Sequence, residues 1–477
     1  MAIKFGTDGW RAIIAQDFTF ENVKRVAQAT ADYVNANMRN GRPSVVVGFD
    51  TRFLSDRFAQ TTASVLAAND IQVWLTRADS PTPAVSYNVV AKEADAGVMI
   101  TASHNPPRYN GFKLKSRDGA AASPAACAEV EKYLESWLAS GKAPREMPYE
   151  QALREERIIR FDPAWTYFEH LQNLLDLDMI SRSEALVIAD PMFGSGRGIL
   201  QAMLARTRIN LIEIRGYMNP GFQGIHPEPI AKYLDMLMAT IKREHADIGL
   251  ATDGDADRIG AVDRNGEFVD PHMIMALALR YFVEKRGLRG DVVKTVSTTA
   301  MLNRIAKAHG LEILETPVGF NHVADWMLKN NVLIGGEESG GISVKGHIPE
   351  GDGILMGLVL LEVLGAYDAP LHEIIADVQA AYGPTVYRRD DLRLAVQIPK
   401  AAMVKRLADC APGQMGGQQV KDVQTTDGIK FILADESWLL IRPSGTEPVL
   451  RVYAEATSEA MVKDLLQVGR QLAAQVE

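Results

Sequence analysis

Short apolar runs alternate with amphipathic stretches over most of the chain. Residues 44–48 form a β-branched run, a helix-like stretch covers 59–68, and a second apolar run follows at 71–74. The same succession starts again at 186–189 and at 292–296. Strands that alternate with helices are typical of β-α-β units, and continuous apolar strands fit sheets covered on both faces. The pattern predicts three similar α/β domains with mixed, mainly parallel sheets.

The chain beyond about residue 384 follows a different pattern. Residues 386–398 alternate between apolar and charged side chains, and apolar runs at 438–441 and 449–454 flank a loop. Helices are expected over 400–410 and 458–474. Strands and helices mixed in this order predict a C-terminal α+β domain.

The length of the chain fits this division. A chain of 477 residues is too long for one hydrophobic core, and domains of about 100–200 residues would number three or four. We expect domains over residues 1–150, 151–264, 265–375 and 376–477.

The composition of the chain limits the kinds of molecule that the protein is expected to bind. Hydrophobic residues make up 47% of the chain and charged residues 23%, and the formal net charge is −9. This balance argues against a nucleic-acid partner but leaves small anionic ligands open. The most apolar stretch, 354–367, is interrupted by Glu362 and falls short of the roughly 18 apolar residues of a membrane span. It predicts a buried helix, and with no apolar signal core at the N-terminus we expect a cytoplasmic protein.

Three aspartates follow an apolar run at 248–250. Asp253, Asp255 and Asp257 alternate with small residues, so in extended chain their side chains point the same way. Like charges this close favour a hard cation such as Mg²⁺, which prefers oxygen ligands. An exposed Asp-rich turn is the alternative. A calcium EF-hand fails, because its sixth and twelfth positions would be Arg258 and Arg264.

Two further loops carry polar groups beside strands. The segment 442–448 (RPSGTEP) combines an Arg fork, hydroxyl donors and a glycine that permits an anion nest, so it predicts a phosphate pocket. A hairpin loop with a surface Arg is the alternative. The segment 335–341 (GGEESGG) offers carboxylate and hydroxyl groups to sugar hydroxyls, or it is a flexible turn. The segment 194–198 misses the dinucleotide-loop spacing and is interpreted as a structural turn.

Ser103 lies in the segment 101–106 (TASHNP), between an apolar run and two prolines. His104 is its neighbour in sequence, and neighbouring side chains rarely align as a nucleophile–base pair. No G-x-S-x-G elbow surrounds this serine. The better hypothesis is that Ser103 carries a phosphate, whose oxygen a metal on the three aspartates would hold.

These four loops, in this order, resemble those of the α-D-phosphohexomutase family over essentially the whole chain. The resemblance implies three related α/β domains and a smaller fourth domain around a central cleft, an active phosphoserine and one Mg²⁺. It implies that the phosphate on Ser103 and the carboxylates of Asp253, Asp255 and Asp257 bind Mg²⁺, that Arg11 and Arg258 stabilise the transferring phosphoryl group, and that Lys113 acts as acid or base with His104 as a helper. It further implies that Glu337 and Ser339 bind sugar hydroxyls and that Lys294 lies near a sugar-phosphate contact. The phosphate that does not react would be held by Arg442, Ser444, Gly445 and Thr446.

Sugar specificity is where the sequence departs from some members of that family. Gly341 stands where some members have His, and Asn321 where related enzymes often have Lys. The Glu-Glu-Ser form of the sugar loop favours glucose. The resemblance therefore implies interconversion of glucose 1-phosphate and glucose 6-phosphate through a hexose 1,6-bisphosphate, with mannose or glucosamine phosphate as alternatives. A metal-dependent phosphatase and a sugar-phosphate sensor are the alternative functions. We expect a monomer or a homodimer that binds neither nucleic acid nor a membrane.

Overall fold

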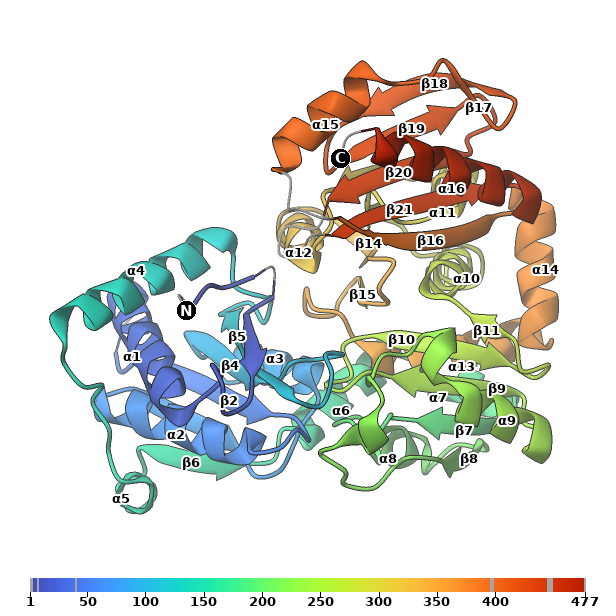
Figure 1. Cartoon of the computed structure of the whole chain (residues 1–477). Helices are drawn as coiled ribbons and strands as arrows, with labels where there is room; N and C mark the ends of the chain where they lie inside the picture. The colour runs from blue at the N-terminus through green and yellow to red at the C-terminus, as the bar shows by residue number, and fades with distance from the viewer. Residues whose placement is uncertain (1–2, 7, 39–40, 395–398, 444–448, 476–477) are drawn as a thin grey trace.

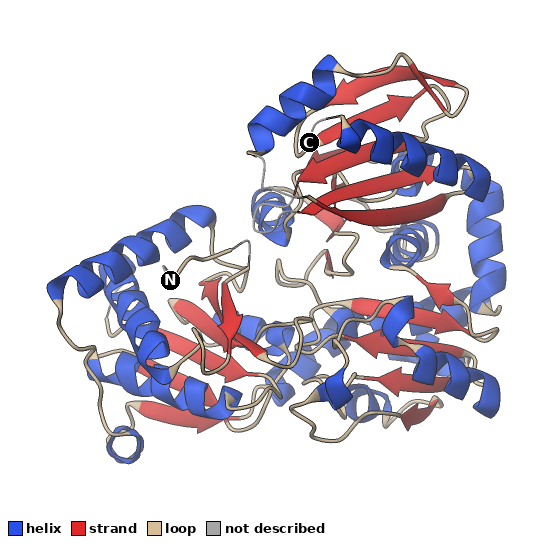
Figure 2. Ribbon diagram, viewed as in Figure 1, coloured by secondary structure: helices blue, strands red, loops and turns tan. Residues whose placement is uncertain are grey.

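The computed structural model describes residues 3–6, 8–38, 41–394, 399–443 and 449–475. Figure 1 shows the chain running from a blue N-terminal part on the left, through a green part at lower right, to an orange and red C-terminal part at upper right. The chain forms four sheets, which follow one another along the sequence, and helices accompany the strands throughout (Figure 2).

The first sheet has six strands in the order β1-β5-β4-β2-β3-β6. Its strands are β1 (Trp10–Ile13), β2 (Ser44–Phe49), β3 (Gln72–Thr76), β4 (Ala96–Ile100), β5 (Tyr109–Ser116) and β6 (Ile158–Phe161). The pairs β4–β2, β2–β3 and β3–β6 are parallel, whereas β5 runs antiparallel to β4 and to β1. The helices are α1 (Phe20–Asn37), α2 (Ser55–Ala68), α3 (Thr82–Ala91), α4 (Pro124–Ser140) and α5 (Tyr149–Arg154).

The second sheet has the order β11-β10-β9-β7-β8. It comprises β7 (Leu186–Asp190), β8 (Asn210–Glu213), β9 (Ile248–Thr252), β10 (Ile259–Asp263) and β11 (Phe268–Val269). Its helices are α6 (Ala164–Leu174), α7 (Leu177–Arg182), α8 (Ile199–Leu204) and α9 (Asp235–Glu244), with 3-10 turns η1 (Phe222–Gly224) and η2 (Ala231–Tyr233). Strand β7 pairs in parallel with β8 and β9, and β10 is antiparallel to β9.

The third sheet has the order β13-β12-β14-β15. It comprises β12 (Asp291–Thr295), β13 (Ile313–Thr316), β14 (Val332–Gly336) and β15 (Ile342–Val344). Its helices are α10 (Pro271–Glu284), α11 (Met301–Ala308), α12 (Phe320–Lys329), α13 (Gly353–Tyr367) and α14 (Leu371–Tyr382). Strand β12 is parallel to β13 and β14, and β15 is antiparallel to β14.

One arrangement recurs in these three sheets. The first parallel strand lies between the second and the third, and the third strand is followed by an antiparallel strand beside it. The loops between the third strand and its antiparallel partner are residues 101–108, 253–258 and 337–341. The three loops that carry the predicted serine, metal and sugar groups therefore occupy the same topological position in three sheets.

The fourth sheet is antiparallel throughout and has the order β16-β21-β20-β19-β18-β17. It comprises β16 (Val386–Arg393), β17 (Gln414–Met415), β18 (Gln418–Gln424), β19 (Ile429–Leu433), β20 (Trp438–Pro443) and β21 (Val449–Ala456), with α15 (Lys400–Asp409) and α16 (Glu459–Ala474). Helices α15 and α16 bury Met403, Leu407, Val462 and Leu465 against this sheet. The expected α/β part followed by an α+β part is confirmed.

The predicted buried helix is α13, which is enclosed from Gly353 to Leu364. Its apolar side chains belong to one core with those of the second and third sheets, so these two sheets share a hydrophobic interior. In the described part of the chain, no single helix is long and apolar enough to cross a membrane, although α13 and α14 together, bent by 80°, meet the length and composition criteria.

Two strands lie just beyond the expected domain limits. Strand β6 pairs with β3 past residue 150, and β11 pairs with β10 past residue 264. These pairings place the ends of the first two sheets a few residues further along the chain than the expected boundaries, and the domain limits stay predictions.

Candidate active site

Ser103 lies at the end of β4, in the loop that leads to β5. It is 1% exposed and has a φ of +51°, a left-handed conformation that is uncommon for a residue with a side chain. Its Oγ donates a hydrogen bond of 2.7 Å to Asp253 Oδ2, and Nδ1 of His104 lies 3.3 Å from the same oxygen. The structure therefore brings the predicted serine against the predicted metal loop, 150 positions further along the chain.

Asp253, Asp255 and Asp257 are buried at the end of β9. One carboxylate oxygen from each lies within 4.8 Å of the others. Oδ1 of Asp255 and Oδ1 of Asp257 are buried without a hydrogen-bond partner. Burial, together with Asp257 and Asp255, raises the pKa of Asp253 well above its usual range. Oxygen donors with unsatisfied lone pairs, crowded into one buried space, fit a hard cation such as Mg²⁺.

Lys113 on β5 reaches the same carboxylates. Its Nζ is 2.9 Å from Asp255 Oδ2, 2.8 Å from Asp257 Oδ2 and 2.7 Å from Asp8 Oδ2. Burial would lower the pKa of Lys113, but Asp255, Asp257 and Asp8 together raise it well above its ordinary value. In this arrangement Lys113 is an ammonium ion among three carboxylates.

Helix α3 of the first sheet anchors the metal loop. Thr82 donates from Oγ1 to Asp255 Oδ2 at 2.6 Å and from its backbone N–H to the Asp255 carbonyl at 2.8 Å. Burial would raise the pKa of Asp255, but Lys113 and the Thr82 hydroxyl lower it to about 2. Asp255 is therefore held ionised and oriented by groups from another domain.

The two predicted arginines both contact residues beside this cluster. Arg11 on β1 donates from Nη1 to Asn105 Oδ1 at 2.7 Å, and its Nη2 is 3.3 Å from Asp8 Oδ2. Arg258 donates its backbone N–H to Asp253 Oδ1 at 3.2 Å, and its guanidinium Nε lies 3.9 Å from Asp257. Both arginines therefore place positive charge beside the loops that carry Ser103 and the aspartates.

His104 is a neutral group in this positive surrounding. Burial lowers the pKa of His104 well below its usual range, and Arg258, Arg11 and Lys113 add to the effect. Its Nδ1 faces the Ser103 hydroxyl at 3.3 Å. An uncharged imidazole at this distance can accept a proton from a neighbouring oxygen.

The predicted sugar loop adjoins the metal loop. The Gly340 carbonyl accepts a hydrogen bond from the Ile259 N–H at 3.2 Å. Glu337 Oε1 accepts from the Gly319 N–H at 2.8 Å, and burial together with Glu338 raises the pKa of Glu337 to about 8. Ser339 is half-buried on the same loop. Glu337 and Ser339 thus lie beside the metal loop, as expected for residues of one site.

Lys294 and Arg442 occupy different surroundings. Lys294 is 1% exposed, donates to the carbonyls of Thr298 and Thr299 at 3.1 and 3.0 Å, and lies 3.4 Å from Glu315 Oε1. Its ammonium is therefore enclosed by its own loop and by Glu315 of β13, and its contact with a sugar phosphate stays a prediction. Arg442 at the end of β20 donates from Nε to Asp427 Oδ2 at 2.8 Å. Ser444, Gly445 and Thr446 lie outside the described residues.

A link joins Arg442 to the third sheet. Asp427 Oδ2 also accepts from the backbone N–H of Val318 at 3.0 Å, in the loop that contains Gly319. Gly319 in turn holds Glu337. A continuous series of contacts therefore runs from Ser103 through the metal and sugar loops to Arg442.

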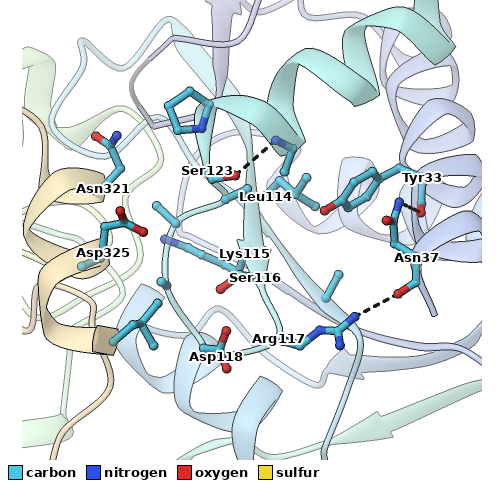
Figure 3. Close-up of a pocket in the computed structure, with 18 of the residues that line it drawn as sticks. Tyr33, Asn37, Leu114, Lys115, Ser116, Arg117, Asp118, Ser123, Asn321 and Asp325 are labelled. Atoms are coloured by element: carbon cyan, nitrogen blue, oxygen red, sulfur yellow. Dashed lines mark hydrogen bonds between the residues drawn. The ribbon is translucent and has the colours of Figure 1, made fainter. Parts of the chain in front are cut away.

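A cavity of about 330 Å³ lies apart from the reacting groups. It is enclosed by β5, the ends of α1 and α4, and helix α12 (Figure 3). Asp325 faces Lys115 across it, and Asn321 lines it on the side of Asp325. Neither Ser103 nor the three aspartates line this cavity.

Three residues of the site carry no role in the sequence analysis. Asp8 contacts Lys113, Arg52 contacts the loop of Ser103, and Thr82 contacts Asp255. Asp8 and Arg52 lie in turn-rich polar segments, and this location in the sequence is the feature that could have indicated a role in the site. Thr82 lies at the start of a helix, where a Thr is ordinary and gives no signal.

The geometry agrees with comparisons to known proteins. The chain matches the four domains described as "Phosphoglucomutase/phosphomannomutase", with alpha/beta/alpha domain I at residues 2–139, domain II at 166–266, domain III at 270–382 and the C-terminal domain at 395–468.

Individual relatives cover nearly the whole chain. It is 31% identical to a "Phosphoglucomutase/phosphomannomutase" of Thermococcus kodakarensis, over 98% of both chains. It is 32% identical to a "Probable phosphoglucosamine mutase" of Pyrococcus furiosus, over 98% of this chain and 97% of that one. A crystal structure of a "putative phosphomannomutase" from Thermus thermophilus superposes with a TM-score of 0.86 at 34% identity, over 99% of both chains.

These relatives share one fold and one reaction class with different sugar names. The buried aspartate cluster beside Ser103 fits the Mg²⁺ dependence of that class. The chain belongs to the phosphoglucomutase/phosphomannomutase family of α-D-phosphohexomutases, intramolecular phosphotransferases that act on hexose phosphates.

Proposed function

We propose that this enzyme interconverts glucose 1-phosphate and glucose 6-phosphate through a phosphorylated Ser103 and a glucose 1,6-bisphosphate intermediate. The observation that carries the proposal is the contact of 2.7 Å between Ser103 Oγ and Asp253, inside a cluster of three buried aspartates. A hydroxyl held against potential metal ligands and surrounded by cationic side chains suits a phosphoryl carrier.

In the first half-reaction, the free hydroxyl of the sugar phosphate attacks the phosphorus on Ser103. The new bond joins phosphorus to the sugar oxygen, and the bond from phosphorus to Ser103 Oγ breaks. The proton of the sugar hydroxyl ends on Ser103 Oγ, so that atoms and charge balance. Asp253, Asp255 and Asp257 would hold Mg²⁺, whose positive charge would make the phosphorus more electrophilic.

In the second half-reaction, the bisphosphate presents its other phosphate to Ser103. The phosphorus bonds to Ser103 Oγ, and the sugar oxygen leaves with the serine proton. Lys113 is an ammonium ion in the present arrangement, which suits donation of a proton to the leaving sugar oxygen. We therefore assign proton acceptance to the neutral imidazole of His104, at 3.3 Å from Oγ.

The phosphate that does not react needs a separate holder. Arg442 is the described residue of the predicted phosphate loop, and a guanidinium suits phosphate because it offers a fixed fork of donors. Fixing one phosphate at Arg442 while the sugar reverses would present either end to Ser103. Approach of the fourth domain would exclude water and protect the phosphoserine.

Two other sugars compete with glucose. The names of relatives at 31–34% identity include mannose and glucosamine mutases, which supports testing mannose 1-phosphate and glucosamine 1-phosphate beside glucose 1-phosphate. The Glu337-Glu338-Ser339 sequence of the sugar loop favours glucose.

The test measures kcat/KM for the three hexose 1-phosphates with Mg²⁺ and a trace of the matching bisphosphate. Glucose 1-phosphate should give the highest value, and intact mass spectrometry should find one phosphate on Ser103. Ser103→Ala should abolish turnover and phosphate incorporation, whereas Ser64→Ala, at a buried serine of α2, should leave both intact. Preference for another sugar would refute the glucose assignment, and sustained release of inorganic phosphate would favour a phosphatase.

A further inference from the structure

Arg52 is a buried arginine that contacts the Ser103 loop only through backbone atoms. It follows β2 and is 2% exposed. Its Nη2 donates to the carbonyls of Ser103 and Asn105 at 2.5 and 2.6 Å, and its Nη1 donates to those of Pro106 and Tyr109 at 2.9 and 3.0 Å. One planar guanidinium therefore binds three carbonyls of the Ser103 loop and that of Tyr109, the first residue of β5, and its fixed fork of donors sets their relative positions.

A second set of contacts fixes the amide side of Ser103. Asp50 lies 3.2 Å from Arg52 Nε and accepts from Thr101 Oγ1 at 2.6 Å. Thr101 Oγ1 accepts in turn from the backbone N–H of Ser103 at 2.9 Å. Ser55 Oγ donates to the other Asp50 oxygen at 2.7 Å. The peptide groups on both sides of Ser103 are thus connected to the Asp50–Arg52 pair.

These contacts stabilise a backbone conformation that Ser103 would otherwise avoid. A φ of +51° is unfavourable for a residue with a side chain, because Cβ crowds the following carbonyl. This conformation coincides with the hydrogen bond from Oγ to Asp253. The metal loop also packs closely here, since a Cβ at Gly254 would lie 2.5 Å from the Ser103 carbonyl oxygen. A shift of the loop would therefore move the reacting oxygen relative to the aspartates.

Arg52 is also enclosed by the second domain. The ring of Phe222 in η1 lies 5.1 Å from the Arg52 guanidinium. The arginine is therefore packed between the Ser103 loop and a segment of the neighbouring domain, where it cannot reorient freely. No described hydrogen bond or ion pair connects the Arg52 guanidinium to the side chain of Ser103.

We infer that Arg52 is a positioning residue for phosphoryl transfer: through four backbone carbonyls it holds the Ser103 loop so that Oγ faces the three aspartates. The inference rests on the proposed role of Ser103 as phosphoryl carrier. A lysine at this position keeps the charge but is a single donor centre on a flexible stem, so it cannot hold four carbonyls in one geometry.

The test compares Arg52→Lys with Arg215→Lys. Arg215 is a matched control, because it is also buried, pairs with Asp190 at the end of β7, and donates to a backbone carbonyl, that of Tyr233. We expect Arg52→Lys to lower kcat about 100-fold, as a displacement of about 1 Å at a reacting group does, while KM stays within about twofold. The rate at which bisphosphate phosphorylates Ser103 should fall by a similar factor.

Hydrogen exchange gives a second readout that needs no turnover. The peptide over residues 100–110 should exchange faster in Arg52→Lys than in the unmodified protein and in Arg215→Lys. A drop in kcat accompanied by faster exchange in this peptide supports the inference. Equal exchange, a kcat within about threefold, or an equal loss of kcat in Arg215→Lys overturns it.

The outcomes also separate this inference from the proposed function. If the unmodified enzyme turns over no hexose phosphate, the proposed function fails, and the exchange comparison still decides whether Arg52 holds the loop. If Arg52→Lys does not fold, Thr101→Val, which removes the acceptor of the Ser103 N–H with little change in shape, is judged by the same criteria.

Discussion

Replacing Thr82 by valine tests how the first domain supports the metal loop of the second. The change removes a hydroxyl that donates to Asp255 Oδ2 at 2.6 Å, and both residues are buried. The backbone contact from the Thr82 N–H to the Asp255 carbonyl, at 2.8 Å, is unaffected by the side chain. Valine has nearly the shape of threonine, so the perturbation is confined to one hydrogen bond.

The magnitude follows from the character of that bond. A hydroxyl that donates to a buried carboxylate contributes about 1.5–3 kcal/mol. Without it, Asp255 Oδ2 keeps only Lys113 as a described partner, at 2.9 Å. A loss of about 2 kcal/mol in holding the ligand corresponds to roughly 30-fold weaker Mg²⁺ binding, within the range of about 10–100-fold seen for groups that orient metal ligands.

Titration calorimetry with Mg²⁺ measures this loss directly. Lys113, which the variant retains, is the strongest of the groups that lower the pKa of Asp255 to about 2. This carboxylate therefore stays ionised in the variant at neutral pH, and the ratio of the two Mg²⁺ affinities should not change between pH 6 and 8. Thr62→Val is the matched control, since Thr62 is buried and donates to the Phe58 carbonyl within α2. Mg²⁺ affinity within about twofold of the unmodified protein in Thr82→Val, or an equal loss in Thr62→Val, would refute the reasoning.

Two further changes test other parts of the site, and a third tests how the stability of the protein depends on pH. Arg442→Ala should weaken binding of both glucose 1-phosphate and glucose 6-phosphate by about 30–100-fold in calorimetry, because a charge-assisted contact of about 2–3 kcal/mol is lost; unchanged affinities would remove Arg442 from the phosphate pocket. His104→Gln should lower kcat at least about 100-fold with little change in KM, because a proton acceptor beside Ser103 is lost; a retained kcat would return proton acceptance to Lys113. Burial and His347 lower the pKa of His170 from 6.5 to about 4, so the unfolded chain takes up a proton first and stability is lost as the pH falls from 6.5 to 4. The melting temperature of His170→Gln should fall less over this range than that of the unmodified protein, and an equal fall would exclude His170 as the source.

The sequence allowed much of the architecture to be predicted because buried parallel strands are continuous apolar runs. The run at 44–48 is β2, and the apolar stretch at 354–367 is the enclosed helix α13. The four chemically distinctive loops were found because polar residues directly after a buried strand stand out. The pairing of β1 with β5 was not predicted, since it joins segments about a hundred residues apart and has no local pattern.

At the site, the residues that could not be predicted are those whose partners lie far away in the sequence. Arg52 binds backbone carbonyls and Thr82 binds a carboxylate of another domain, and neither contact leaves a mark in the local sequence. The charge of Lys113 depends on three carboxylates from two distant segments, which no spacing reveals. Lys294 was identified by its sequence position, while its enclosure depends on how its own loop folds back.

The recurrence of one loop position in three sheets makes the chemistry of this enzyme modular. Each of the segments 101–108, 253–258 and 337–341 is anchored at both ends by strands of its own sheet. A change in the length or composition of one segment can therefore leave the strand pairing of the other two sheets unchanged. Under the proposed function, transplanting only residues 337–341 from a relative with another preferred sugar should alter recognition of the hexose and leave Ser103 and the three aspartates on their original supports.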